Sequence, residues 1–188
     1  MFNRFVAALA ILTASSAPLA AQDAKLSDPQ IAHIATTAGD IDINAAELAL
    51  KKAKNGAVRA FAKEMVRDHK SVNQKAAALL QKLGVTAQDN DTSQGLVQQA
   101  EEKRATLEKL SGADFDKAYI ANEAAFHRVI DDALRDTLIP GAGNAELRDF
   151  LQTSLKMFEG HQQHAEKIGQ DLDKPVEPRR RTTNPKQT

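Results

Sequence analysis

Residues 57–84 read AVRAFAKEMVRDHKSVNQKAAALLQKLG, and this stretch decides the fold class of the chain. Its apolar residues recur every three or four positions from Val58 to Leu83, a spacing that predicts one long amphipathic helix. Gly84 follows at once, as a glycine that ends a helix usually does. At the other end, Asn55-Gly56 interrupts the apolar pattern and separates this helix from the segment before it.

The same periodicity predicts three further long helices. We expect them over residues 29–53, after the capping sequence Ser27-Asp28-Pro29, from Asp114 to a turn at Ile139-Pro140-Gly141, and from Asn144 to residue 172 or so. A shorter helix that ends at Ser111-Gly112 lies between the two pairs. Because tight turns join the helices within each pair and a long connection joins the pairs, we predict an all-α, ferritin-like four-helix bundle over residues 27–173, with an extra short crossover helix.

The composition narrows the classes of function. The 25 Lys and Arg residues balance 25 Asp and Glu residues, so no overall positive charge favours nucleic acid, and we expect no nucleic-acid binding. The chain has no Cys, which excludes disulfides, thiol nucleophiles, zinc–thiolate sites and iron–sulfur clusters. It also lacks a glycine-rich phosphate loop and a nucleophile elbow, so no catalytic motif supports an enzymatic activity.

Both ends of the chain differ from the helical part. Residues 1–21 combine a basic start at Arg4, an apolar run and small residues before the end, which is the pattern of a removable Sec-type signal peptide. We therefore expect cleavage near Ala20 or Ala21, a periplasmic or secreted mature protein, and no stable membrane span. Residues 174–188 are rich in Pro and contain the basic run Arg179–Arg181, and we expect them to form a disordered polar tail.

Five polar side chains fall on the inward faces of the predicted helices and are the candidate functional residues. They are His69 on the second long helix, Glu123 and His127 on the third, and His161 and His164 on the fourth. Buried polar groups normally find hydrogen-bond partners, so our first interpretation is that these histidines bond to Asp or Tyr side chains between helices and bind no cofactor. The alternative is a metal ion, because imidazole binds zinc, copper or iron without a fixed motif.

A ferritin-type di-metal site is not expected. Such a site takes a Glu from each of two helices and a Glu-x-x-His motif from each of the other two. The chain contains no Glu-x-x-His, and Val66 occupies the position three residues before His69. On the first helix, the pattern places the neutral residue Asn44 on the apolar face. A mononuclear site built from the histidines and the glutamate of the last two long helices remains as the metal alternative.

The segment around the second helix resembles the bacterial family called domain of unknown function 4142. The resemblance rests on Leu48-Ala49, Asn55, Val58, Phe61-Ala62, Met65-Val66, Asp68-His69, Asn73 and Leu83-Gly84, with Tyr119, His127 and His161 further on. It covers residues 28–172 and implies an exported, ferritin-like helical domain, described as an outer-membrane or periplasmic protein, with no established reaction. It also implies that His69, His127 and His161 stand where the family usually has histidine, whereas Asn44 replaces a residue that is often acidic.

These observations lead to competing functional hypotheses. The first is an exported envelope protein without enzymatic activity, which acts in stress tolerance or as a helical module that binds an unidentified protein partner. The alternative is a metal-binding or metal-dependent redox protein that uses histidines in the bundle core. A third hypothesis, association with a membrane surface, requires an exposed apolar helix face. The oligomeric state stays open.

Overall fold

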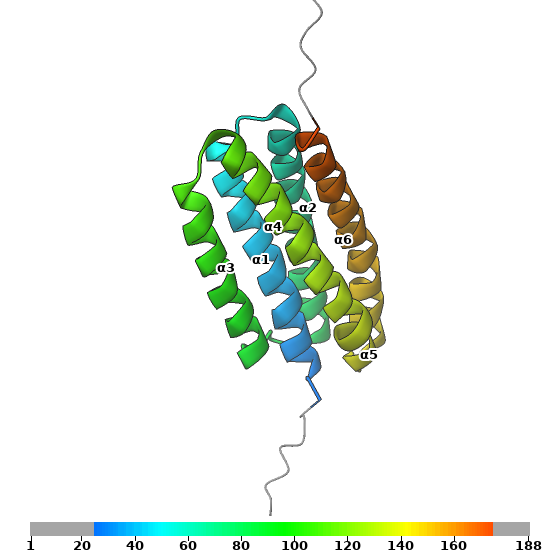
Figure 1. Cartoon of the computed structure of the whole chain (residues 1–188). Helices are drawn as coiled ribbons and strands as arrows, with labels where there is room; N and C mark the ends of the chain where they lie inside the picture. The colour runs from blue at the N-terminus through cyan, green and yellow to red at the C-terminus, as the bar shows by residue number, and fades with distance from the viewer. Residues whose placement is uncertain (1–24, 175–188) are drawn as a thin grey trace, which may run out of the picture.

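Four long helices lie side by side in the computed structural model, which describes residues 25–174 (Figure 1). They are α1 (Asp28–Lys52), α2 (Gly56–Leu83), α4 (Gly112–Ala133) and α6 (Ala145–Leu172). The most extensive packing joins α1 to α2 and α4 to α6, so the bundle consists of two helical hairpins placed face to face. The predicted all-α bundle is confirmed. The expected signal peptide and all but the first residue of the expected tail lie outside the described residues.

The helix ends follow the capping residues of the sequence. Asn55 and Asn144 precede α2 and α6, and each side-chain oxygen accepts hydrogen bonds from two backbone N–H groups of the first turn. Gly84 ends α2 with a φ of 64°, in the left-handed region that glycine adopts without steric cost. The predicted boundaries of the long helices therefore agree with the observed ones to within a few residues.

The two tight turns are each held by a carboxylate from another helix. Asp116 of α4 accepts hydrogen bonds from the backbone N–H groups of Lys54 at 3.1 Å and Asn55 at 2.8 Å in the α1–α2 turn. Asp28 of α1 accepts from Gly143 at 2.7 Å and Asn144 at 2.8 Å, before α6. These bonds satisfy backbone donors that the turns leave free.

The turn predicted at Ile139-Pro140-Gly141 is itself helical, which corrects the expectation that the third long helix stops there. A π-helical turn, η1 (Leu134–Leu138), follows α4 and leads into the short helix α5 (Ile139–Gly141). The N–H of Ile139 donates to the carbonyl of Leu134, so the wider turn satisfies the backbone just before the proline. A proline in a regular α-helix removes one backbone hydrogen bond and clashes with the preceding turn.

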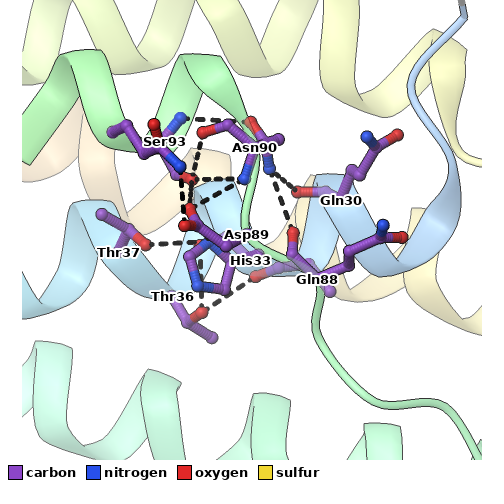
Figure 2. Close-up of polar contacts among 10 residues, drawn as sticks. Gln30, His33, Thr36, Thr37, Gln88, Asp89, Asn90 and Ser93 are labelled. Carbon is purple, nitrogen blue, oxygen red and sulfur yellow. Dashed lines mark hydrogen bonds and ion pairs between the residues drawn. The ribbon is translucent and has the colours of Figure 1, made fainter.

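The crossover helix α3 (Asp91–Lys109) lies along the outside of the bundle against α1 and α4 (Figure 1). Its start is bound to the start of α1, because Asn90 donates to the Gln30 carbonyl at 3.3 Å and the Gln88 N–H donates to the Pro29 carbonyl at 3.0 Å. Figure 2 shows this network, including His33 with its ring 3.8 Å from Asp89. A groove of about 590 Å³ remains between α1, α3 and α4.

The apolar core has two parts, one at each end of the bundle. One part contains Phe61, Phe115 and Ile168, and the other contains Ile34, Leu134 and Leu151. Buried polar side chains from all four long helices lie between the two parts and form what we call the polar layer: Asp42, His69, Glu123, His127, Asp131 and His161. None of the described helices is both long and apolar enough to cross a membrane.

Candidate metal centre

Three buried histidines meet in the polar layer. His69 comes from α2, His127 from α4 and His161 from α6, and their ring centroids lie 5.2 to 5.6 Å apart. One ring nitrogen from each lies within 4.8 Å of the other two. The helical periodicity explains the convergence, because each histidine continues the apolar stripe that faces the bundle axis.

Hydrogen bonds fix the tautomers of two of these rings. His127 Nδ1 lies 3.0 Å from the backbone carbonyl of Glu123, and His161 Nε2 lies 3.2 Å from Asp68 Oδ2. A carbonyl and a carboxylate only accept hydrogen bonds, so both of these nitrogens carry the proton. The lone pairs therefore stand on His127 Nε2 and His161 Nδ1, and neither atom has a hydrogen-bond partner among the described residues.

Hydrogen bonding explains only part of the histidine cluster. Three rings have six nitrogens, and four of them have no partner in the described part of the chain: both nitrogens of His69, His127 Nε2 and His161 Nδ1. Buried polar groups without partners are costly in a folded protein. The first interpretation, that the histidines are hydrogen-bonded core residues, therefore accounts for two of the six nitrogens.

The histidines stay neutral because they are buried. Burial, followed by the neighbouring His127 and His161, lowers the pKa of His69 to about 2. Burial likewise lowers the pKa of His127 to about 3, with His161 as the second cause. A neutral imidazole is the form that binds a metal ion, since protonation removes the lone pair.

Two carboxyl groups lie beside the histidines. Asp42 Oδ2 of α1 is 3.4 Å from His69 Nε2 and 4.0 Å from His127 Nε2. Asp42, Glu123 and His127 form a second group whose ligand atoms lie within 4.8 Å of one another. Burial, together with the nearby Glu123 and Asp131, raises the pKa of Asp42 well above its ordinary value, and burial raises the pKa of Glu123 to about 8.

Helix α4 carries a column of polar side chains toward the bundle axis. Tyr119, Glu123, His127 and Asp131 follow one another at four-residue spacing and are all buried. The Tyr119 hydroxyl, Glu123 Oε2 and both Asp131 carboxyl oxygens lack partners among residues 25–174. Burial, followed by repulsion from Glu159, raises the pKa of Asp131 to about 7.

Aromatic and charged neighbours hold the histidines in place. The Phe158 ring stacks on His69 with centroids 5.0 Å apart and meets His127 edge-on at 5.9 Å, so one side of the cluster is shielded from water. On another side, Arg67 donates to both oxygens of Asp68, at 2.6 and 2.9 Å. The hydrogen bond from Arg67 is the main cause that lowers the pKa of Asp68, and the resulting carboxylate orients His161.

The structure gathers four of the five sequence candidates and leaves one apart. His69, Glu123, His127 and His161 lie in the polar layer, whereas His164 is partly exposed and its Nδ1 lies 2.9 Å from Glu64 Oε2. Three residues along a helix turn the direction by about 300°, so His164 points roughly 60° away from His161. The predicted participation of His164 in the core cluster is not what the geometry shows.

One residue of α1 lies elsewhere than its sequence pattern predicts, and two residues of the polar layer were not predicted. Asn44 is exposed, which corrects its predicted place on the apolar face of the first helix. Asp42 faces the bundle centre instead, and Asp131 joins it from α4. Asn44 was placed wrongly because Ile41 was counted as a core residue, whereas it lines the groove beneath α3. In sequence, an apolar residue covered by a second neighbouring helix cannot be distinguished from one that faces the bundle core.

The fold and the polar layer define a class: an all-α bundle protein with a histidine and carboxylate cluster at its centre. The chain belongs to the family described as domain of unknown function (DUF4142), whose sequence model matches residues 13–168. The fold is similar to the solved structure of "CopM in the Cu(II)-bound form", with a TM-score of 0.59, 13% sequence identity, and coverage of 78% of this chain and 98% of that chain. No curated protein matches the sequence.

Proposed function

We propose that this protein binds a divalent transition-metal ion in the centre of the bundle, through His69, His127 and His161. The observation that carries the proposal is the set of neutral, buried imidazole nitrogens that have no partner in the described part of the chain. A metal ion would satisfy three of these nitrogens at once. Such an ion replaces the hydrogen bonds that the polar layer lacks.

The neighbouring carboxyl groups supply the charge that such an ion needs. Three neutral histidines leave a divalent ion with two uncompensated positive charges in a buried site. Asp42 and Glu123, once deprotonated, compensate them from the same layer. Their raised pKa values mean that the ion displaces protons when it binds.

The donor atoms select the class of metal. The layer offers nitrogen and oxygen ligands, and the chain has no Cys to supply thiolate. Imidazole with carboxylate suits Cu(II), Zn(II) or iron, in contrast to Cu(I), which prefers sulfur. The similar solved structure is CopM in its Cu(II)-bound form, so Cu(II) is the first ion to test and Zn(II) the second.

Binding and retention of an ion require no catalysed reaction, so the proposal is a metal-binding protein, not an enzyme. The expected signal peptide adds a proposed location in the periplasm or outside the cell, where such a protein would hold metal away from other molecules. The absence of Cys suits this setting, because no thiol competes for the metal or becomes oxidised.

Titration calorimetry tests the proposal on the mature chain, with Cu(II) and Zn(II) added separately after treatment with a chelator. We expect one tightly bound ion in the wild-type protein and none in the His127→Ala, His161→Ala double variant. His33→Gln serves as the matched control, because it removes a histidine beside a carboxylate outside the polar layer. A wild-type protein that binds neither ion refutes the proposed function.

A further inference from the structure

A second group of metal-ligating side chains lies on the seam between α2 and α6. Glu64 and Asp68 are one turn apart on α2, and His161 and His164 are three residues apart on α6. His164 Nδ1 is 2.9 Å from Glu64 Oε2, and His161 Nε2 is 3.2 Å from Asp68 Oδ2. Ligand atoms of Glu64, Asp68 and His161 all lie within 4.8 Å of one another. Two carboxylates and two imidazoles are a ligand set for a divalent transition metal.

These side chains lead from solvent to the histidine cluster. The exposed fraction of the side chain falls from 45% at His164 and 31% at Glu64 to 21% at Asp68, 4% at His161 and 0% at His69. His161 belongs both to the group on the seam and to the three central histidines. A metal ligand is therefore present at each step from the surface to the centre.

The seam also lies where the two helical hairpins meet. The extensive packing is within each hairpin, α1 on α2 and α4 on α6, and the contact of α2 with α6 is smaller. Small separations of two rigid hairpins cost less than opening a hairpin, because fewer packed side chains lose contact. An ion that moves inward along this seam therefore disturbs the least packing.

The positive charge beside Asp68 at this seam is the guanidinium of Arg67. The guanidinium binds both oxygens of Asp68, while the Arg67 side chain is 70% exposed. An exposed ion pair contributes little to stability, so an arriving metal ion displaces the guanidinium into solvent at low cost. The contact shows that the Asp68 carboxylate accepts a positive charge in this position.

The groove beneath α3 is the competing path to the polar layer. It reaches Asn122, whose side-chain amide is 3.4 Å from Glu123 Oε1. Its charged lining residues are Asp40, Glu101, Lys103 and Arg104, which carry no net charge. The two carboxylates of the α2–α6 seam outnumber the single guanidinium of Arg67, so the seam keeps a net negative charge and attracts a cation more strongly.

We propose that Glu64, Asp68 and His164, together with His161, form an outer binding site for divalent transition-metal ions that loads the central site. This inference rests on the proposed function, since it requires a central site to be loaded. At the outer site the ion replaces the proton of His161 Nε2 beside Asp68, and that proton moves to Nδ1 or to solvent. The ion then passes to the central histidines when Nε2 takes a proton again and leaves the lone pair on the buried Nδ1, which has no partner within the described residues.

A rate measurement tests the route. The probe is Cu(II) mixed rapidly with the metal-free mature chain, and visible absorption reports occupancy of the central site. In the Glu64→Gln, His164→Gln double variant we expect loading to slow at least about tenfold, because the carboxylate that steers the cation and the first imidazole are gone. The final amount of tightly bound Cu(II) stays the same. A wild-type loading rate in this variant overturns the inference.

The control variant is His33→Gln with Glu47→Gln, which removes one histidine and one partly exposed carboxylate away from the seam. It is expected to load at the wild-type rate. Circular dichroism verifies that each variant is folded. Slowing of equal size in the control would mean that general surface charge sets the rate, and this result also overturns the inference.

An equilibrium measurement isolates the outer site. In the His69→Phe, His127→Leu variant, the central site loses two of its three histidines while the seam keeps its four ligands. We expect this variant to bind one Cu(II) ion weakly, and to lose it when Glu64→Gln and His164→Gln are added. If the central variant binds no Cu(II) although the wild type does, only the outer site is refuted. If the wild type itself binds none, the proposed function fails.

Discussion

Asp42 Oδ2 lies 3.4 Å from His69 Nε2. A carboxyl group of α1 and an imidazole of α2 therefore meet in the centre of the bundle, at a distance longer than that of a good hydrogen bond. Asp42 Oδ1 has no partner among the described residues. The carboxyl group contributes little to the metal-free fold, because burial and the nearby Glu123 and Asp131 raise its pKa and disfavour its charged form. Its contribution arises when a positive charge enters the layer.

Replacing Asp42 with Asn tests this contribution. Asn keeps the shape of the side chain and removes the charge, so we expect the affinity for Cu(II) to fall about 10–100-fold, the usual effect of losing a group that supports the ligands. The metal-free protein should unfold at the same denaturant concentration as the wild type or higher. Calorimetry with Asp132→Asn as an exposed control measures the effect. Unchanged affinity would exclude Asp42 from charge compensation.

Replacing His69 with Phe tests whether His69 binds a metal ion or stabilises the fold. Neither ring nitrogen of His69 has a hydrogen-bond partner in residues 25–174, and the ring already stacks on Phe158. We expect the metal-free variant to be more stable than the wild type by about 1–2 kcal/mol, because an unpaired buried polar group is removed. Tight metal binding at the central site should be lost. Urea unfolding gives the stability, and a destabilised variant would show that His69 serves the fold.

The metal-free protein should be most stable in mildly acidic solution. Burial raises the pKa of Glu123 from 4.5 to about 8, so between these values the folded state binds more protons than the unfolded chain. The contribution of Glu123 to the free energy of unfolding therefore falls as the pH rises from about 4.5 to 8, by up to about 1.4 kcal/mol per pH unit. Asp131, with its pKa raised to about 7, acts in the same direction.

The histidines limit stability at lower pH. The folded pKa values of His69 and His127, about 2 and about 3, lie below the ordinary value of 6.5. Below pH 6.5 the unfolded chain binds more protons at these rings, so their contribution to stability decreases as the pH falls toward these values. The maximum is expected between about pH 4.5 and 6.5. Urea unfolding with EDTA measures this profile.

Bound Zn(II) should prevent the loss of stability that the metal-free protein shows as the pH rises above its stability maximum. The ion binds the deprotonated carboxylates and the neutral rings, so its affinity increases from about pH 6 to 8. Unfolding followed with excess Zn(II) should then show no loss of stability over this range. A metal-free protein whose stability increases from about pH 6.5 to 8 would contradict the raised pKa of Glu123.

Gly39 is required where α1 approaches α2. A Cβ at this position would collide with Asn73 Oδ1, and Asn73 also donates to Asp40 at 2.7 Å. We expect Gly39→Ala to destabilise the protein by about 1–2 kcal/mol, because the overpacking cost exceeds the gain in helix propensity.

The matched control is Gly95→Ala in α3, where a Cβ meets no described atom within 4 Å. That substitution should stabilise the protein by about 0.5–1 kcal/mol, since it removes the entropy cost of a helical glycine. Thermal unfolding of both variants provides the comparison. Equal effects of the two substitutions would mean that Asn73 moves aside without cost.

Periodicity predicted the helices and the three central histidines, because His69, His127 and His161 continue apolar stripes. It failed at Asp42, since α1 is covered on two faces, and Ile41 and Ala45 on the face under α3 drew the predicted apolar stripe away from Asp42. Asp131 was overlooked beside Asp132, where two adjacent acidic residues resemble a solvated surface. The distances among side chains of four helices depend on crossing angles, which local spacing does not contain.

The polar layer divides the apolar core into two parts, and this division has a consequence for cooperativity. The four long helices run through both ends, but each end packs as a unit of its own, and the polar layer between them joins the helices through poorly hydrogen-bonded side chains in the metal-free protein. Amide hydrogen exchange should then reveal two ends that open at different free energies. An ion bound to three helices joins the ends, so the loaded protein should unfold in a single transition.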